Sequence, residues 1–534
     1  MASSSHRPGA GAGAWVGLAV AAPVTAFLFA AHRALEAPFP PFALFELLTR
    51  LAPGALVTRG IDVMVSLIRR VGLEDTAQAA KLTEQVLAGA VFLFLAAVLG
   101  AAAFVAARRT PSSRSSIVVG LVGGGVLAAM WVGALIAQGE GAGGIALALV
   151  GAALWGGGLA WAHRALSRSE RTAATAPAGA PMDRRTVVVR IGTATAVLTF
   201  AGVALSRALT RSKGPGVGGA GVPWSATNPL PNADAPVLPV PGTRPELTPV
   251  DKHYRIDINL VPPRIRESDW RLRFGGLVEQ ERAFTLDELR ALPALHQLIT
   301  LACISNPVAG DLIGTTRWSG VSLSRVLDEV GVRPEATHLK LTSADSFDEI
   351  VSIAEARSDP RVMLTYAWDG LPLTEEHGFP LRIYLPNRYG MKQPKWIERI
   401  EAISGWEPGY WVRRGWDREA RMKATSVIDV VGPEPIRNSR GELVLPIGGI
   451  AHAGARSISR VEVRVDGGEW RPAELREPLS PLTWVLWRYE WPFQAGEHTF
   501  EVRCIDGEGA AQLTERAPPH PSGASGLHSV TRTV

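Results

Sequence analysis

Long apolar stretches dominate the first two hundred residues of the chain, whereas charged residues are interspersed throughout the remainder. A helix needs about 20 mostly apolar residues to cross a bilayer. Five stretches meet this requirement, and they run from Ala14 to Ala31, Val86 to Ala107, Ile117 to Gln138, Gly143 to His163 and Val187 to Ser206. Their high glycine and alanine content favours close helix packing in lipid. The pattern predicts an all-α transmembrane region over residues 1–210, with about five spans.

The stretch from Phe39 to Gln85 is harder to assign because arginine and aspartate residues interrupt its apolar positions. We interpret it as amphipathic helices that lie on the membrane surface or against the bundle. The number of spans near residues 35 to 85 is therefore left open.

Basic residues in the loops predict the orientation of the bundle. Arg108, Arg109 and Arg114 follow the second stretch, and a second basic cluster, which includes Arg184 and Arg185, lies between the fourth and the fifth. Positively charged loops stay in the cytoplasm, so we expect the chain after Ser206 on the outer face of a multi-pass membrane protein. The arginine pair before a weakly apolar segment also matches a twin-arginine export signal, although ordinary loop charge explains it equally well.

The polar remainder divides into three parts. Residues 211–250 are rich in glycine and proline and predict an extended linker. Residues 251–424 mix short strands such as Arg271–Gly276 with short helices such as Thr285–Leu292 and predict an α+β domain. From residue 425 to 534 alternating strands with Asp-Gly turns predict an all-β, immunoglobulin-like sandwich.

Composition excludes some classes of protein. The net charge of +5 is small for 534 residues, and no basic cluster is interleaved with aromatic residues, so nucleic acid is not an expected partner. The two cysteines lie far apart in different predicted domains, which argues against a disulfide scaffold. Cys504 alternates with apolar residues in a predicted strand, and we expect it in the core.

Cys303 is the residue with the clearest chemical potential. It ends an apolar run (Leu298 to Leu301) and begins a loop of small and polar residues, ITLACISNPVAGDLIG. A thiol at a strand end, beside backbone donors, is suited to bind a soft metal or to act as a nucleophile. A lone cysteine is nevertheless more often a buried structural residue.

Four ordered segments give the loop a context: TLACISNPVAGDLIGTTRWSGVSL, LTYAWDGLPLTEEHGFPLRIYLPNRYGMKQPKWIERIE, GYWVRRGWDREA, and VEVRVDGGEW with RCIDGEG. Together they resemble the sulfite oxidase family of molybdopterin-dependent oxidoreductases, in a membrane-anchored bacterial form. The resemblance covers about 280 residues from Asp251 onward and leaves the apolar region uncovered.

The resemblance implies roles for individual residues. Cys303 would be the protein thiolate on molybdenum, and Tyr366 would be the catalytic tyrosine beside the oxygen ligand of the metal. The expected contacts of the molybdenum–molybdopterin cofactor are Asn306, Arg317, His377, Arg388 and Lys395, with Arg388 and Lys395 near its phosphate. Arg255, in HYRIDIN, would receive an oxyanion substrate. The family has Asn-His after that arginine, but this chain has Ile256 and Asp257, and a carboxylate there would repel sulfite.

The resulting hypothesis is a membrane-anchored molybdenum oxidoreductase that transfers oxygen atoms with two electrons on the extracytoplasmic face. The substrate would be a small oxyanion, which is oxidised, or an S-oxide or N-oxide, which is reduced. Electrons would pass to an external one-electron carrier or come from a membrane quinol system, and no haem is expected, because His32 and His163 lie at span ends. A homodimer through the β domain is a further expectation from the family. The alternative from another class is a non-catalytic binding scaffold.

Overall fold

The computed structural model describes residues 8–35, 37–54, 56–57, 59–60, 63–64, 67, 76–111, 114–139, 141–175, 184–209 and 229–534. The chain forms two compact units. One comprises Met1–Pro53 and Ala80–Gly214, and the other comprises Gly54–Ala79 and Pro215–Val534. Residues 211–228 of the predicted linker, and residues 68–75 of the predicted amphipathic segment, lie outside the described residues.

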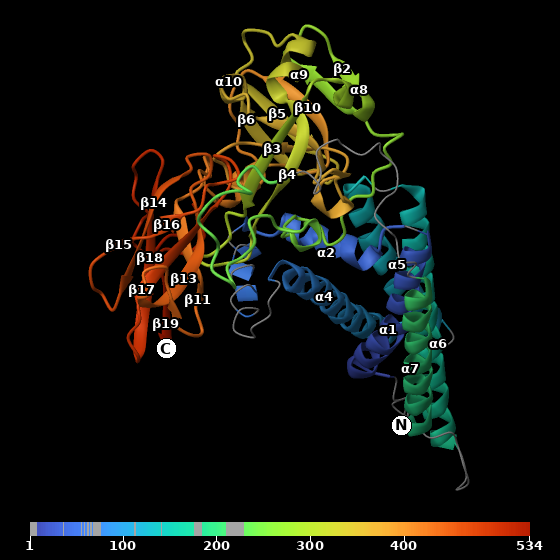
Figure 1. Ribbon diagram of the computed structural model, residues 1–534. Helices are drawn as coiled ribbons and strands as arrows, with labels where there is room; N and C mark the ends of the chain where they lie inside the picture. Colours follow the sequence, from blue (N-terminus) through green and yellow to red (C-terminus); the bar gives the residue numbers. More distant parts are fainter. Residues whose placement is uncertain are drawn as a thin grey trace. The chain divides into compact units, whose positions relative to one another are not determined.

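The first unit is helical (Figure 1). Its helices are α1 (Ala10–Leu35), α2 (Pro40–Leu51), α4 (Thr76–Ala107), α5 (Ser115–Ala137), α6 (Ala142–Thr175) and α7 (Arg184–Leu209). Among the described residues, four helical segments are long and apolar enough to cross a membrane: Ala10–Leu35, Gln78–Ala107, Ser115–Ala137 and Ala142–Arg168. The fifth predicted span lies within α7, whose apolar part, Gly192–Ala204, is shorter. The count of five spans therefore stays a prediction.

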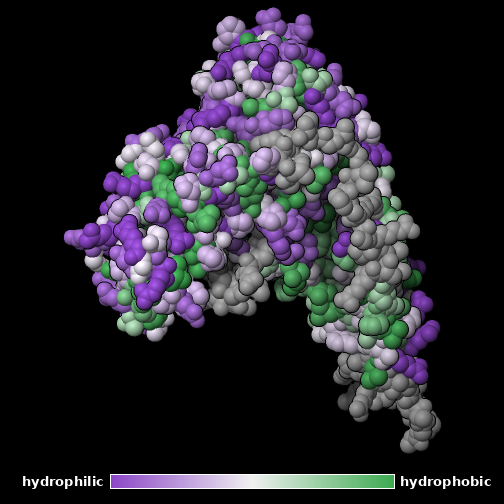
Figure 2. Space-filling model, viewed as in Figure 1, coloured by the Kyte–Doolittle hydropathy of each residue, from purple (hydrophilic) through white to green (hydrophobic). Residues whose placement is uncertain are grey.

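Small residues bring two of these helices together, as the composition predicts. A methyl group added to Gly156 of α6 would come within 2.7 Å of the carbonyl oxygen of Gly120 on α5. Large apolar side chains such as Leu121 and Phe200 are instead 70% and 77% exposed, as lipid-facing residues are. On the face shown in Figure 2, hydrophobic residues are frequent over the long helices, and hydrophilic ones prevail over the β-rich unit.

The central domain contains two five-stranded sheets. The first has the order β2-β1-β10-β5-β6 and is antiparallel except for the β1–β10 pair. Its strands are β1 (Leu272–Gly276), β2 (Arg282–Phe284), β5 (His338–Ser343), β6 (Asp348–Ser352) and β10 (Ile397–Ile403). The second has the order β3-β4-β7-β8, with β9 paired to β7. Its strands are β3 (Ala294–Ala302), β4 (Ile313–Ser322), β7 (Met363–Trp368), β8 (Leu371–Pro372) and β9 (Arg382–Tyr384).

Three short helices complete this domain: α8 (Leu286–Ala291), α9 (Leu323–Val330) and α10 (Ile353–Ser358). Helix α8 begins with a capping box, in which the Thr285 side chain accepts from the Glu288 backbone N–H and the Glu288 carboxylate accepts from the Thr285 N–H. Apolar residues of both sheets and of these helices form one core, with Phe274, Leu327 and Ile400 fully buried. The predicted α+β class is confirmed.

The C-terminal domain is an all-β sandwich, as predicted; its immunoglobulin-like character remains a prediction. One sheet has the order β11-β13-β17-β16, with β12 paired to β13, and the other has the order β15-β14-β18-β19. The strands are β11 (Thr425–Val431), β12 (Ile436–Arg437), β13 (Leu443–His452), β14 (Ile458–Val465), β15 (Arg471–Pro472), β16 (Glu474–Leu475), β17 (Val485–Pro492), β18 (Glu497–Asp506) and β19 (His528–Thr533). Trp487, Phe500 and Cys504 lie in the core that both sheets share.

The sandwich is hydrogen-bonded to β3, the strand that leads to Cys303. The Thr300 N–H donates to the carbonyl oxygen of Leu482 at 3.0 Å, and the Trp484 N–H donates to the Thr300 hydroxyl at 2.8 Å. Apolar residues of both domains, among them Ala302 and Leu486, pack into one buried cluster. The position of the thiol is thus fixed from both domains.

Candidate active site

The loop after β3 holds Cys303 by backbone hydrogen bonds. The Cys303 N–H donates to the Leu312 carbonyl at 2.9 Å, and its carbonyl accepts from the Asn306 N–H at 3.0 Å. The Asn306 side chain closes the loop, because its Oδ1 accepts from the Leu312 N–H at 3.0 Å. Asn306 therefore shapes the loop that carries the thiol.

The thiol itself is almost completely buried, at 7% exposure, and its Sγ lies 2.9 Å from the Ser305 hydroxyl. Burial raises the pKa of the Cys303 thiol, so the cofactor-free protein keeps it protonated at neutral pH. Binding of a soft metal cation would displace that proton and stabilise the thiolate.

Aromatic and imidazole side chains surround the thiol. Tyr254 and Ile256 pack against the small buried cluster of Cys303 and Leu312, and the Tyr254 ring stacks on His253 with 5.2 Å between ring centroids. The ring centroids of His253 and His377 lie 5.6 Å apart, with the two rings in an edge-on arrangement. The segment HYRID, at the start of the central domain, thereby reaches the loop after β3.

Three cations lie next to this group, and two of them share one carboxylate. Asp257 Oδ2 accepts from Arg255 Nε at 2.8 Å and from Lys395 Nζ at 3.1 Å, and the Asp257 side chain is only 2% exposed. Lys395 also donates to the Glu376 carbonyl at 2.8 Å. Arg382, in β9, donates from Nη1 to the His377 carbonyl at 3.1 Å and packs on the Trp318 ring at 5.0 Å. Three positive charges around one negative charge favour an anionic ligand.

Two of these cations have buried N–H groups without an acceptor. Arg255 Nη2 and Arg382 Nε have no hydrogen-bond partner among the described residues. An unsatisfied buried donor costs about 1–3 kcal/mol, and more when it is charged. The cluster is therefore shaped for a ligand that brings oxygen acceptors. A phosphate-bearing cofactor with a soft metal fits both this cluster and the neighbouring thiol.

Burial also sets the protonation states in the cluster. Burial, together with the nearby Arg382 charge, lowers the pKa of His253 to about 3. Burial and the neighbouring His253 lower the pKa of His377 well below its usual range. Both imidazoles are neutral at pH 7, whereas burial lowers the pKa of Lys395 only to about 8, since Asp257 opposes it. Lysine and arginine thus carry the positive charge of the site.

Five of the eight residues expected from the sequence lie in this region: Arg255, Cys303, Asn306, His377 and Lys395. The other three are engaged elsewhere. Arg317 donates from Nη1 to Asp369 Oδ1 at 3.0 Å, while its neighbour Trp318 packs against Arg382.

Arg388 and Tyr366 also lie apart from the thiol. Arg388 is held by the carboxylates of Glu355 and Glu419, at 3.1 and 2.7 Å, which neutralise the charge expected to meet a phosphate. Tyr366 lies in the hydrophobic core of the central domain. The packing favours Tyr254 as the tyrosine beside Cys303.

Sequence reasoning missed Tyr254, His253 and Arg382. The sequence around Arg382 could have indicated a functional role, because this arginine interrupts the apolar strand PLRIYLP. All three residues of β9 are buried, and arginine is almost never buried without a partner. His253 and Tyr254 precede Arg255 in the quoted HYRIDIN segment and had no separate signal.

Comparisons with known proteins agree with this chemistry. Residues 259–411 match the model of the oxidoreductase molybdopterin binding domain. The chain is 34% identical over 191 residues to a protein of Azospira oryzae named putative protein-methionine-sulfoxide reductase subunit YedZ1, which is 35% of this chain and 68% of that protein. It is 28% identical over 290 residues to human mitochondrial sulfite oxidase, covering 46% of this chain and 53% of that enzyme.

The chain thus spans about half the length of the mitochondrial sulfite oxidases it matches. Among solved structures, the sulfane dehydrogenase SoxCD from Paracoccus pantotrophus is similar at 24% identity and a TM-score of 0.47, covering 53% of this chain and 80% of that one. A likeness at that level does not bear on function.

The neutral state of His253 predicts acid sensitivity of the cofactor-free protein. An unfolded histidine binds a proton near pH 6.5, whereas His253 in the folded chain does so only near pH 3. The stability that this difference provides is complete above pH 6.5 and is lost as the pH falls. His253→Gln should remove this term, so urea unfolding at several pH values should show a wild-type slope steeper by about 1.4 kcal/mol per pH unit between pH 6 and 4. Parallel slopes would contradict the assignment.

Proposed function

The chain belongs to the sulfite oxidase family of molybdenum-dependent oxidoreductases, and from this premise we propose that it catalyses two-electron oxygen-atom transfer at a site centred on Cys303. One observation carries the proposal: a buried thiol lies beside an excess of buried cations whose N–H groups Arg255 Nη2 and Arg382 Nε lack acceptors. A structural cysteine would need neither the charge nor the open donors. Apolar helices long enough to span a membrane accompany this site in the same chain.

Each residue of the cluster has a role in this proposal. Cys303 would bind the metal, Arg382 and Lys395 would hold the anionic part of the molybdopterin, and Arg255 would face the substrate. When bound, the cofactor supplies a metal that cycles through two-electron changes. Neutral His253 and His377 offer hydrogen bonds without adding charge, because burial lowers both pKa values. Burial raises the pKa of Tyr254, so its hydroxyl keeps its proton and donates to an oxygen in the site.

The overall reaction balances in either direction. Oxidation of sulfite consumes one water and yields sulfate, two protons and two electrons. Reduction of an S-oxide or N-oxide consumes two protons and two electrons and yields the sulfide or amine and one water. Protons must therefore cross the protein in both cases, and the buried hydroxyl of Tyr254, next to Cys303, is suited to hold one of them.

Metal content tests the proposal against a non-catalytic scaffold. Wild-type protein from a host that makes the cofactor should contain about one molybdenum per chain, and Cys303→Ser should lose most of it, because the soft thiolate is replaced by a hard hydroxyl. Cys504→Ser is the matched control, since Cys504 is also buried but lies in the sandwich core. A metal-free wild type, or full retention in Cys303→Ser, would overturn the proposal.

Reduction of an S-oxide is a second candidate, and Asp257 favours it. Its carboxylate compensates the Arg255 and Lys395 charges within the site, which leaves less positive charge for a doubly negative sulfite ion. An uncharged S-oxide does not need that charge. The Azospira relative, 68% of which is matched, carries the name of a methionine-sulfoxide reductase subunit, and this name points to the same class.

The ratio of two activities tests the role of Asp257. With artificial electron donors and acceptors, Asp257→Asn should shift kcat/KM toward sulfite, lowering the ratio of S-oxide reduction to sulfite oxidation by about tenfold, or about 1.4 kcal/mol. Asp328→Asn, at an exposed ion pair of α9, is the control. An unchanged ratio in Asp257→Asn would remove Asp257 from substrate selection.

The membrane half gives the proposed location. Basic residues between the spans favour a cytoplasmic position for those loops, and the catalytic domain would then lie on the extracytoplasmic side. Electrons would be exchanged there with an external one-electron carrier or with a membrane quinol system.

A reporter fusion tests this orientation. Alkaline phosphatase, which is active only outside the cytoplasm, should be active when fused after Lys213, because that residue follows the last apolar segment. A fusion after Arg109, in a loop expected inside, is the matched control and should be inactive. The reverse pattern would overturn the topology.

A further inference from the structure

A short helical turn of the central domain, η3 (Gly390–Lys392), lies directly against the tyrosine beside the thiol. A methyl group added to Gly390 would lie 3.1 Å from the Tyr254 hydroxyl oxygen and 3.5 Å from the Ala302 carbonyl oxygen. Ala302 directly precedes Cys303 in the chain. The backbone of η3 therefore forms one wall around the Tyr254 hydroxyl.

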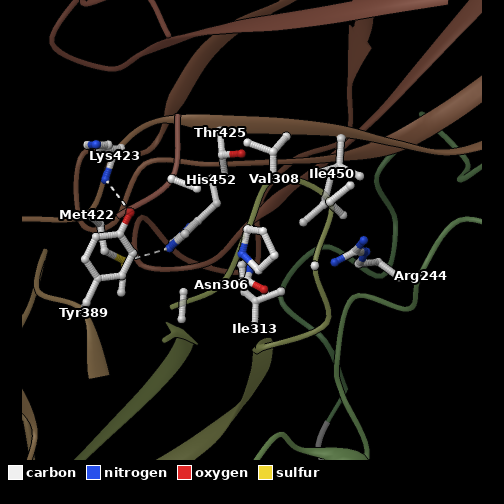
Figure 3. Close-up of a pocket in the computed structure, with 16 residues that line it drawn as sticks. Arg244, Asn306, Val308, Ile313, Tyr389, Met422, Lys423, Thr425, Ile450 and His452 are labelled. Carbon is white, nitrogen blue, oxygen red and sulfur yellow. Dashed lines mark hydrogen bonds between the residues drawn. The ribbon is translucent and has the colours of Figure 1, made fainter. Parts of the chain in front are cut away.

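Side-chain hydrogen bonds hold the chain on both sides of η3. Before the turn, the Tyr389 hydroxyl accepts from the Lys423 N–H at 3.2 Å (Figure 3). After it, Gln393 Nε2 donates to the Arg388 carbonyl at 2.9 Å. Neither bond reaches the first sheet of the central domain. The turn is linked to that sheet by Lys392, its last residue.

Lys392 forms a buried ion pair with Glu349 of β6. Its Nζ lies 2.5 Å from Glu349 Oε1, and the two side chains are 7% and 0% exposed. The same oxygen accepts from the Ile350 N–H at 2.8 Å, whereas Oε2 has no hydrogen-bond partner among the residues that the structure describes. Burial raises the pKa of the Glu349 carboxyl, and the Lys392 charge is the largest effect that opposes this rise. One oxygen and one ammonium group thus connect β6 to η3.

The backbone at Gly409 confines the carboxylate of this pair. A methyl group added to Gly409 would come within 2.5 Å of Glu349 Oε1 and 3.1 Å of Oε2. The residues after Gly409 are tied to the same strand, because the Tyr410 N–H donates to the Asp348 carbonyl at 3.0 Å and Arg413 Nη1 donates to the Asp348 carboxylate at 2.8 Å. The carboxylate is therefore held in place on the side that faces away from η3.

A buried ion pair of this kind is poor evidence for stability. Two charges that leave water lose hydration, their mutual attraction offsets this loss only in part, and apolar residues of similar volume often support folding equally well. The pair supplies a direction that apolar residues do not, because the ammonium group must point at one oxygen. A turn whose position must be fixed benefits from such a bond.

We propose that Glu349 and Lys392 are positioning residues for the reaction: their ion pair holds η3 against the Tyr254 hydroxyl, and η3 keeps that hydroxyl directed into the site beside Cys303. The proposal rests on the oxygen-atom transfer proposed above, in which Tyr254 holds and donates a proton. Glu349 and Lys392 act through the backbone of η3 and are not themselves catalytic. Misplacement of a reacting group by about 1 Å can lower a rate about a hundredfold, so a pair outside the site can control kcat.

Fluorine NMR reads the environment of the Tyr254 ring without turnover. The chain has six tyrosines, and after labelling with meta-fluorotyrosine the Tyr254→Phe variant identifies one resonance. Lys392→Met and Gly409→Ala should each move this resonance in the full-length chain, with and without cofactor, because both disturb the pair that holds η3. Arg413→Gln, which breaks the ion pair of the neighbouring Asp348, is the matched control and should leave the resonance in place. An unmoved resonance in Lys392→Met and Gly409→Ala overturns the positioning role.

An apolar replacement separates position from stability. Glu349→Leu combined with Lys392→Met removes both charges and keeps most of the volume, so its thermal unfolding temperature should stay within about 4 °C of wild type. Its Tyr254 resonance should still move, and kcat of the holoenzyme should fall about tenfold with KM within about twofold and molybdenum retained. Lys392→Arg, which keeps a cationic donor, should lose less than Lys392→Met. An apolar variant with wild-type resonance and kcat would show that packing alone places η3 and would overturn the proposal.

Two further outcomes separate this proposal from the proposed reaction. If the Tyr254 resonance moves as expected but the wild-type holoenzyme turns over neither sulfite nor any S-oxide or N-oxide, the link from the ion pair to Tyr254 is supported and the reaction is overturned. If the wild type turns over and the resonance moves, but the variants keep the wild-type kcat, the reaction is supported and the positioning role is overturned.

Discussion

The cation cluster of Arg255, Lys395 and Arg382 beside the Asp257 carboxylate is the constraint on which the site in the central domain depends. Arg255 and Lys395 meet on one oxygen of Asp257, and Arg382 is covered by Trp318 and by the His377 carbonyl. Charge out of water is costly unless it is compensated, so the surrounding fold must hold this arrangement against repulsion. Strand β9, which carries Arg382, and the HYRID segment, which carries Arg255 and Asp257, contribute to doing so.

The same constraint separates the two sides of the Cys303 loop. On one side lie charge, open N–H donors and neutral imidazoles, which suit an anionic cofactor. On the other lie Val308, Met422 and Ile450, which suit apolar groups. The thiol stands between a polar and an apolar environment, and a single loop closed by Asn306 keeps the two apart.

Local pattern predicted much of the fold. The strand expected at Arg271–Gly276 is β1, the helix expected at Thr285–Leu292 contains α8, and Cys504 lies in the sandwich core. These features could be predicted because hydrophobic periodicity, capping residues and turn residues are properties of short stretches of sequence. The residues of the candidate site were harder to predict from the sequence. Arg317 and Arg388 have the right residue type, but Asp369, Glu355 and Glu419 engage them, and which carboxylate meets which arginine is decided by tertiary packing. Tyr254 and His253 reach Cys303 only through a segment about 50 residues upstream, which no periodicity reports.

The hydrogen bonds between Thr300 and the sandwich have a consequence for synthesis. Thr300 is bonded to Leu482 and Trp484, more than 180 residues later in the chain. Contacts so distant in sequence form late, since a long loop must close first. While the ribosome is still adding the sandwich, the strand that carries the thiol lacks two of its anchors. The strand that carries the thiol therefore gains these two hydrogen bonds only after Leu482 and Trp484 have been synthesised, and a chain truncated before Leu482 would lack them.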